Sequence, residues 1–143
     1  MGKRIEIDLT TDENSSPIEI KDSITIIAVP VYAGRVAPIA LQRLRRLKGN
    51  NAPAILVAVY GNRDYEDALV ELRDETIQLG FTPLAAGAFI GEHSYSRPNM
   101  PIAEGRPDVT DISLPVILKI RCPVMACFRP VDVHLPFLVR VQP

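Results

Sequence analysis

The chain has 143 residues, of which 47% are hydrophobic and 23% are charged, a balance typical of a soluble globular domain. Its formal net charge of -1 excludes a strongly basic nucleic-acid-binding protein and gives no electrostatic attraction to an anionic membrane. No apolar stretch reaches the ~20 residues of a membrane-spanning helix, and the start lacks the apolar run of a secretion signal. We therefore expect a cytoplasmic protein with no nucleic-acid or membrane partner.

Composition changes along the chain. All eight glycines lie at or before Gly105, whereas five of the thirteen prolines fall in the last 33 residues. We therefore predict a domain over residues 1–112 and a proline-rich, apolar tail over residues 113–143. The two cysteines, Cys122 and Cys127, are too few for a four-thiolate site. They are typical of reduced cytosolic thiols, and no metal is expected.

The predicted strands begin near the N-terminus. Residues 4–9 alternate apolar and polar side chains, which predicts a strand with one solvated face, and a polar loop follows over residues 10–17. Three short runs that are apolar on both faces come next: Ile24–Val29, Ala54–Tyr60 and Leu84–Ile90. Such runs are typical of strands inside a parallel sheet that is covered by helices on both faces.

The segments between these runs have helical spacing. Apolar residues recur at intervals of three and four over Val36–Leu47 and again over Tyr65–Thr76. Asp64 is placed to cap the second helix, and Gly80 to end it. Strands that alternate with helices predict the α/β class, with an open parallel sheet.

Ligands of open parallel sheets bind at the carboxyl ends of the strands, and three loops follow the apolar runs there: residues 30–35, 60–65 and 91–96. These loops contain all four tyrosines of the chain, namely Tyr32, Tyr60, Tyr65 and Tyr95. A planar heterocycle can stack between such rings while glycine turns bring backbone amides close to its polar edge. The alternative is that tyrosines simply favour half-exposed positions.

Five segments follow one another in order: Pro30–Arg35, Tyr60–Leu69, Gly80–Phe81, Ala88–Ser94 and Ile102–Asp108. Together they resemble the flavodoxin-like domain of bacterial flavodoxin-ferredoxin fusion proteins, over about residues 24–112. The resemblance implies a flavodoxin-like parallel sheet of order 2-1-3-4-5, with flavin mononucleotide (FMN) at the switch point. It implies electron transfer to a ferredoxin or from a reductase, with no catalytic acid or base.

By position, the resemblance also implies the residues that bind FMN. Tyr65 would be the stacking ring of the second loop, and Tyr95 would lie farther out. Arg35 and Arg63 could balance flavin or phosphate charge, and His93 would lie near the flavin edge or in solvent. The full predicted set is Pro30, Tyr32, Ala33, Gly34, Arg35, Tyr60, Gly61, Asn62, Arg63, Tyr65 and His93.

The chain departs from the family at both ends. The first strand-loop-helix unit is absent, and no glycine lies between Lys3 and Ala33 to form its phosphate loop. We therefore expect an incomplete copy of the domain that binds FMN weakly or not at all. Two other functions stay open: an NAD(P)H-dependent FMN or quinone reductase, and a cofactor-free fragment or interaction module.

The missing unit contains the central strand of the family. Its loss would leave an apolar edge along Ile24–Val29, and such an edge recruits another strand or aggregates. We expect the edge to be covered by Ile5–Leu9, by one of the apolar runs of the tail, or by a second copy of the chain in a homodimer. One of those tail runs is Phe137–Val141.

Overall fold

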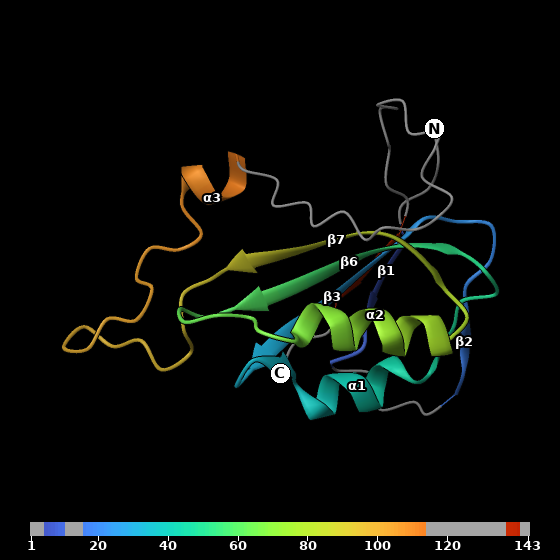
Figure 1. Cartoon of the computed structure of the whole chain (residues 1–143), viewed down its shortest axis with the longest axis horizontal. Coiled ribbons are helices and arrows are strands. Elements are labelled where there is room, and N and C mark those ends of the chain that lie inside the picture. The colour runs from blue at the N-terminus through green and yellow to red at the C-terminus, as the bar shows by residue number, and fades with distance from the viewer. Residues whose placement is uncertain (1–4, 11–15, 114–136, 141–143) are drawn as a thin grey trace.

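The computed structural model describes residues 5–10, 16–113 and 137–140. Its main sheet contains five parallel strands in the order β1-β8-β3-β6-β7 (Figure 1). The strands are β1 (Ile5–Asp8), β3 (Thr25–Tyr32), β6 (Pro53–Tyr60), β7 (Thr82–Ile90) and β8 (Phe137–Arg140). The α/β class is confirmed, and so are the strands predicted from the three apolar runs.

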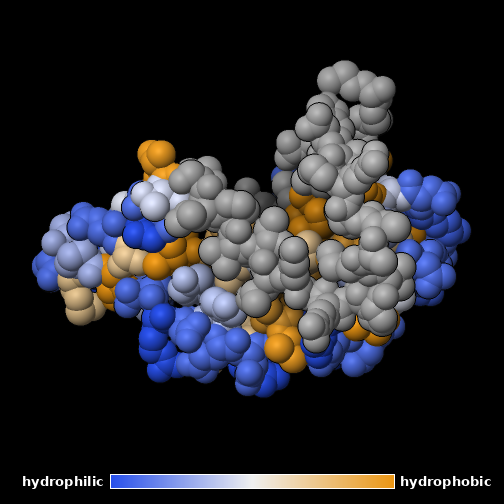
Figure 2. All heavy atoms as spheres, turned by 45° about the horizontal axis from the view of Figure 1, so that its top comes forward, coloured by the Kyte–Doolittle hydropathy of each residue, from blue (hydrophilic) through white to orange (hydrophobic). Residues whose placement is uncertain are grey.

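Side chains of β3 and β6 alternate between two faces of the sheet. Ile27 and Val29 of β3 and Leu56 of β6 are buried, and they join one apolar core with Leu44 and Leu72. The neighbouring residues on the other face of β3 and β6 are apolar too, but they are only partly buried, and 43% of Val59 is exposed. Figure 2 shows hydrophobic residues in the middle of the molecule and mostly hydrophilic residues along its lower border.

Helices α1 (Pro38–Leu44) and α2 (Ala68–Gln78) lie together on one face of the sheet (Figure 1). In the part of the chain that the structure describes, α1 and α2 therefore cover one face of the sheet, whereas the sequence pattern predicted helices over both faces. The reason is the order of the strands: the chain passes from β3 to β6 to β7 in one direction across the sheet, and right-handed crossovers then place both helices on the same side. None of the described helices is long and apolar enough to cross a membrane.

The first helix is shorter than predicted. Val36 belongs to β4 (Arg35–Val36), which pairs antiparallel with the end of β3. Leu47 belongs to β5 (Leu47–Lys48), which forms a separate two-stranded parallel sheet with β2 (Ile18–Glu19). Both residues are buried, so their spacing reports the shared core and not a continuous helix.

The second helix also begins later than predicted. The carboxylate of Asp64 accepts the amides of Tyr65 and Glu66, but Glu66 has a φ of 40°, which is incompatible with a right-handed helix. The helix therefore starts at Ala68. Its predicted end at Gly80 is confirmed, because the amides of residues 80 and 81 donate to the carbonyls of residues 77 and 76.

Ion pairs join α2 to the elements beside it. Nε and Nη2 of Arg35 lie 3.1 and 2.8 Å from the carboxylate of Glu71, which also accepts the amide of Val36 at 2.8 Å. Farther along, Arg45 binds Glu75 at 2.7 Å. The hydrogen bond from Arg35 lowers the pKa of Glu71, and the amide of Val36 lowers it further.

This geometry predicts an acid-sensitive contribution to stability. We expect Glu71→Gln to lower the free energy of unfolding by about 1 kcal/mol near neutral pH, the value of a charge-assisted hydrogen bond discounted for solvent screening. Because the folded pKa of Glu71 lies below its ordinary value of 4.5, the contribution is present above that value and is lost as pH falls through the folded pKa.

Urea unfolding of both proteins at neutral and acidic pH measures the effect. The two curves should differ near neutral pH and converge in acid. Asp74→Asn is the matched control, because Asp74 lies on the same helix and pairs only with its neighbour Arg73 among the contacts described. A loss equal to that of Glu71→Gln in this control would contradict the assignment.

Strand β8 lies between β1 and β3. Phe137 is opposite Ile5 on one side and Thr25 on the other, and the register continues to Arg140. The edge of β3 is therefore covered by Phe137–Arg140, a run of the predicted proline-rich tail, which confirms one of the three expected coverings. β1 lies outside β8, at the border of the sheet.

The position of β8 can be tested with one substitution. A proline inside a strand with partners on both sides removes a ladder hydrogen bond, so Val139→Pro should expose the amides of residues 26–28 to hydrogen exchange and lower the unfolding midpoint. The matched control is Val109→Pro. Val109 is 83% exposed and is the first residue of helix α3 (Val109–Ser113), where proline is tolerated. Unchanged exchange at residues 26–28 in Val139→Pro would refute the pairing.

Candidate functional site

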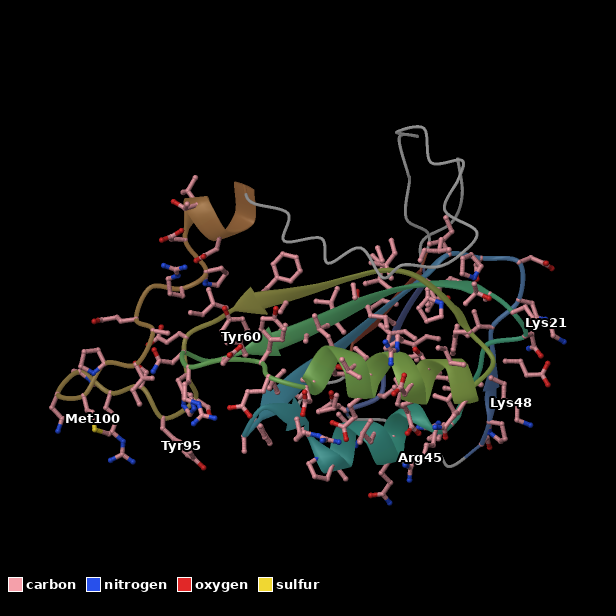
Figure 3. All side chains as sticks on the ribbon, in the orientation of Figure 1. Lys21, Arg45, Lys48, Tyr60, Tyr95 and Met100 are labelled. Carbon is pink, nitrogen blue, oxygen red and sulfur yellow. The ribbon has the colours of Figure 1, made fainter. Side chains whose placement is uncertain are left out.

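A cavity of about 460 Å³ lies at the carboxyl ends of β3, β6 and β7. Its wall is formed by residues 30–33, 59–61 and 91–95. Figure 3 shows Tyr60 and Tyr95 at this end of the sheet, and Lys21 and Lys48 at the opposite end. The three loops predicted from the sequence therefore meet at one site, as expected for an open parallel sheet.

The first loop is a tight β-hairpin. Tyr32 at the end of β3 is opposite Arg35 of β4, and only Ala33 and Gly34 lie between them. Their φ values of 51° and 76° are typical of a type I′ turn. The turn leaves Tyr32 in the cavity wall with 46% of its surface exposed. It also directs Arg35 to Glu71, so the predicted role of Arg35 beside the ligand is not supported by its position.

The second loop brings one tyrosine to the cavity and packs the other behind it. Tyr60 lines the wall, whereas Tyr65 does not. The two ring centroids lie 5.6 Å apart at an angle of 57°, and Tyr65 packs against the core. Arg63 is bound to Glu66 and does not line the cavity.

The third loop folds back on itself and closes the cavity. The amide of Gly91 donates to the carbonyl of Tyr60 at 2.8 Å, which joins this loop to β6. The amides of Glu92 and His93 donate to the carbonyls of Arg106 and Ile102 at 2.9 and 3.1 Å. These backbone bonds hold residues 91–95 against the strand ends, so the wall is supported by main-chain contacts.

The segment that follows the third loop is fixed by charged side chains at residues 106–111. Asp108 accepts the amides of Thr110 and Asp111 at 2.8 and 3.0 Å, and the carboxylate of Asp111 accepts the amide of Asp108 at 2.8 Å. This reciprocal pattern resembles a capping box at the start of α3. The amide of Asp111 lowers the pKa of Asp108 most, and that of Thr110 and the charge of Arg106 add to the effect. Arg106 also binds Asp111.

His93 connects the loop to two neighbours. Its Nδ1 lies 3.1 Å from the amide nitrogen of Tyr95, and the two rings are 5.3 Å apart. Gly61 lies directly behind it, since a Cβ on Gly61 would be 3.0 Å from Cδ2 and 3.1 Å from Cα of His93. Tyr95 itself is 70% exposed. Tyr95 therefore lines the cavity, whereas Tyr65, the predicted stacking ring, lies outside the wall.

About half of the predicted binding residues line the cavity. Those in the wall are Pro30, Tyr32, Ala33, Tyr60, Gly61 and His93. Those outside the wall are Gly34, Arg35, Asn62, Arg63 and Tyr65. Those that the prediction missed are Val31, Val59, Gly91, Glu92, Ser94 and Tyr95. The signal for the missed residues was their place at the ends of β3, β6 and β7, because every residue at a strand end borders this edge of the sheet.

The wall is aromatic and nearly uncharged. Glu92 supplies its one carboxylate, and among the described residues that line the cavity there is no lysine or arginine. Three tyrosines and a histidine present rings and polar groups to the space. The arrangement suits a planar, polar-edged ligand. Within residues 5–10, 16–113 and 137–140, no three His, Cys, Asp or Glu side chains are grouped to hold a metal ion.

Comparison with known proteins does not identify a relative: no family model, no curated protein and no solved structure matches the chain.

The close approach of Gly61 to His93 predicts the effect of one methyl group. Gly61→Ala should displace residues 92–95 and lower the free energy of unfolding by about 1–3 kcal/mol, the usual cost of overpacking. Gly91→Ala is the matched control in the same wall. Its Cβ would meet Val59 at 3.6 Å, an ordinary contact, and we expect little change. Chemical denaturation and the amide spectrum of residues 92–95 measure both effects, and equal behaviour of the two variants would contradict the packing described.

Proposed function

We propose that the chain is a flavodoxin-like electron-transfer domain and that the cavity binds the isoalloxazine ring of FMN. The observation that carries the proposal is the cavity of about 460 Å³ with three tyrosines in its wall, at the carboxyl ends of three neighbouring parallel strands. Pockets of this size at this edge of an α/β sheet are typical of cofactor sites. Aromatic walls favour planar ligands.

The order of the strands gives further support. The flavodoxin-like order 2-1-3-4-5 places a first strand in the second position of the sheet. Here β8 has that position, between β1 and β3. We infer that β8 occupies the position of the family's first strand, so that β1, β3, β6 and β7 correspond to the second to fifth strands of the family.

The residues present fit the ring of FMN better than its phosphate. The tyrosine rings and backbone groups of the wall match a flat heterocycle with a polar edge. A phosphate dianion needs amides at a helix N-terminus or cationic side chains. The described wall contains no such cation, and both predicted arginines are engaged elsewhere, Arg35 with Glu71 and Arg63 with Glu66.

In this proposal the chain binds and orients the ring, and FMN when bound supplies the electron-transfer chemistry. Tyr60 is backed by Tyr65 and offers a firm wall on the inner side. Tyr32 and Tyr95 are more exposed, at 46% and 70%, and they would exclude water from the outer side. No side-chain acid or base is needed, and the redox partner would be a ferredoxin or a reductase.

The exposed ring provides the sharpest test. Tyr95→Ala should weaken riboflavin binding by about 0.5–1.5 kcal/mol, the usual contribution of an aromatic pair beyond area burial. Met100→Ala is the matched control, because Met100 lies on the same segment, is 57% exposed and is outside the cavity wall. Quenching of flavin fluorescence measures both. Because the described wall offers no cation, we expect FMN to bind no more tightly than riboflavin.

Each alternative has its own result. Turnover with reduced nicotinamide by the flavin-loaded chain would favour an NAD(P)H-dependent FMN or quinone reductase. The absence of binding by riboflavin and FMN would refute the proposal and favour a cofactor-free interaction module. Equal losses in Tyr95→Ala and Met100→Ala would place the ligand outside the cavity.

A further inference from the structure

We propose that His93 is a positioning residue that holds Tyr95 in the cavity wall only while its imidazole is neutral, so that acid releases Tyr95 and weakens the binding of a planar ligand. This inference rests on the proposed function for its binding part. Its structural part, the contact between His93 and Tyr95, can be measured without any ligand.

The protonation state follows from the contact. Nδ1 of His93 lies 3.1 Å from the amide nitrogen of Tyr95, and that amide can only donate. Nδ1 must therefore accept, which requires an unprotonated nitrogen there and places the ring proton on Nε2. The folded arrangement selects one neutral tautomer of the imidazole.

The backbone of His93 is held on both sides. Its amide donates to the carbonyl of Ile102 at 3.1 Å, and its carbonyl accepts the amide of Ser96 at 2.8 Å. Gly61 lies behind it, where a Cβ would be 3.0 Å from Cδ2 and 3.1 Å from Cα of His93, which is a tight contact. Because this backbone is held, a change at Nδ1 must be taken up by the imidazole and by Tyr95.

Protonation turns the contact from attractive to repulsive. An imidazolium donates from both nitrogens, so the Nδ1 proton would face the N–H of Tyr95. Acid that places a proton on Nδ1 of His93 would therefore open this part of the wall. Tyr95 is 70% exposed, so little packing opposes its departure.

The charges near His93 reinforce this direction. Glu92 lines the same cavity and would attract an imidazolium away from Tyr95. On the returning segment, Arg106 is already bound to Asp111, and Glu104 is exposed. On β6, the titratable side chain that lines the wall near His93 is that of Tyr60.

In the loop that follows β6, the charged side chains are engaged locally. Arg63 pairs with Glu66, and the carboxylate of Asp64 accepts backbone amides. Neither contact reaches the imidazole, so this loop does not offer His93 a partner that would keep Tyr95 in place after protonation.

The test uses the full chain and compares two amides that differ by one methylene. His93→Asn places a pH-independent oxygen acceptor near the position of Nδ1, whereas His93→Gln carries its oxygen farther out. We expect the wild-type chain to lose roughly three- to tenfold in riboflavin affinity between about pH 8 and pH 5.5, the value of one hydrogen bond. His93→Asn should bind with the same affinity at both values, and His93→Gln should bind weakly at both. His134→Asn is the control and should keep the wild-type pH dependence.

A second measurement needs no ligand. In the free chain, the NMR shift of the Tyr95 amide should titrate together with the His93 imidazole in the wild type and should be flat in His93→Asn. A Tyr95 amide that does not follow His93, or a His93→Asn variant that keeps the pH dependence of binding, overturns the inference. If riboflavin fails to bind at every pH, the proposed function fails and the binding part of the inference with it, while the amide titration still decides whether His93 positions Tyr95.

Discussion

The backbone of β3 needs partners along both of its edges, because its side chains are apolar and an exposed ladder of amides and carbonyls invites aggregation. β6 satisfies one edge and β8 the other. Because β6 and β8 pair with both edges of β3, they fix the direction of β3 in the sheet. They therefore also fix the position of the hairpin at its carboxyl end. Tyr32 lies in the cavity wall because that hairpin begins where β3 stops.

The rest of the site depends on main-chain bonds that start from the same strand ends. Gly91 is joined to the end of β6, and the loop after it is pinned by the carbonyls of Ile102 and Arg106. The charged side chains nearby serve the fold instead of the cavity: Arg35 holds α2 through Glu71, and Arg106 holds α3 through Asp111. The described wall is left aromatic and nearly uncharged.

Much of the fold follows from local patterns. The three apolar runs form strands because short runs that are apolar on both faces are recognisable from their own residues. Local hydrogen bonds at Gly80 close α2 in the same way. The length of α1 was overestimated, since Val36 and Leu47 are buried from strand positions. Helical spacing marks which residues face a common core, but it does not distinguish a helix from short strands that face the same core. The face on which α1 and α2 lie was not predictable either, because the direction of the crossovers is not encoded in any one segment.

By itself, the sequence determined the α/β class, the loops at the carboxyl edge and the gathering of tyrosines in them, because all of these depend on residues close together in the chain. Only the tertiary structure decided which rings reach the cavity and where the arginines point. Arg35 meets a carboxylate 36 residues away, and Tyr65 turns behind Tyr60 because the helix after it starts at Ala68. The insertion of β8 between β1 and β3 was likewise a tertiary choice among several coverings. Such contacts depend on how distant segments are oriented against one another, and the local pattern of side chains carries no information on that orientation.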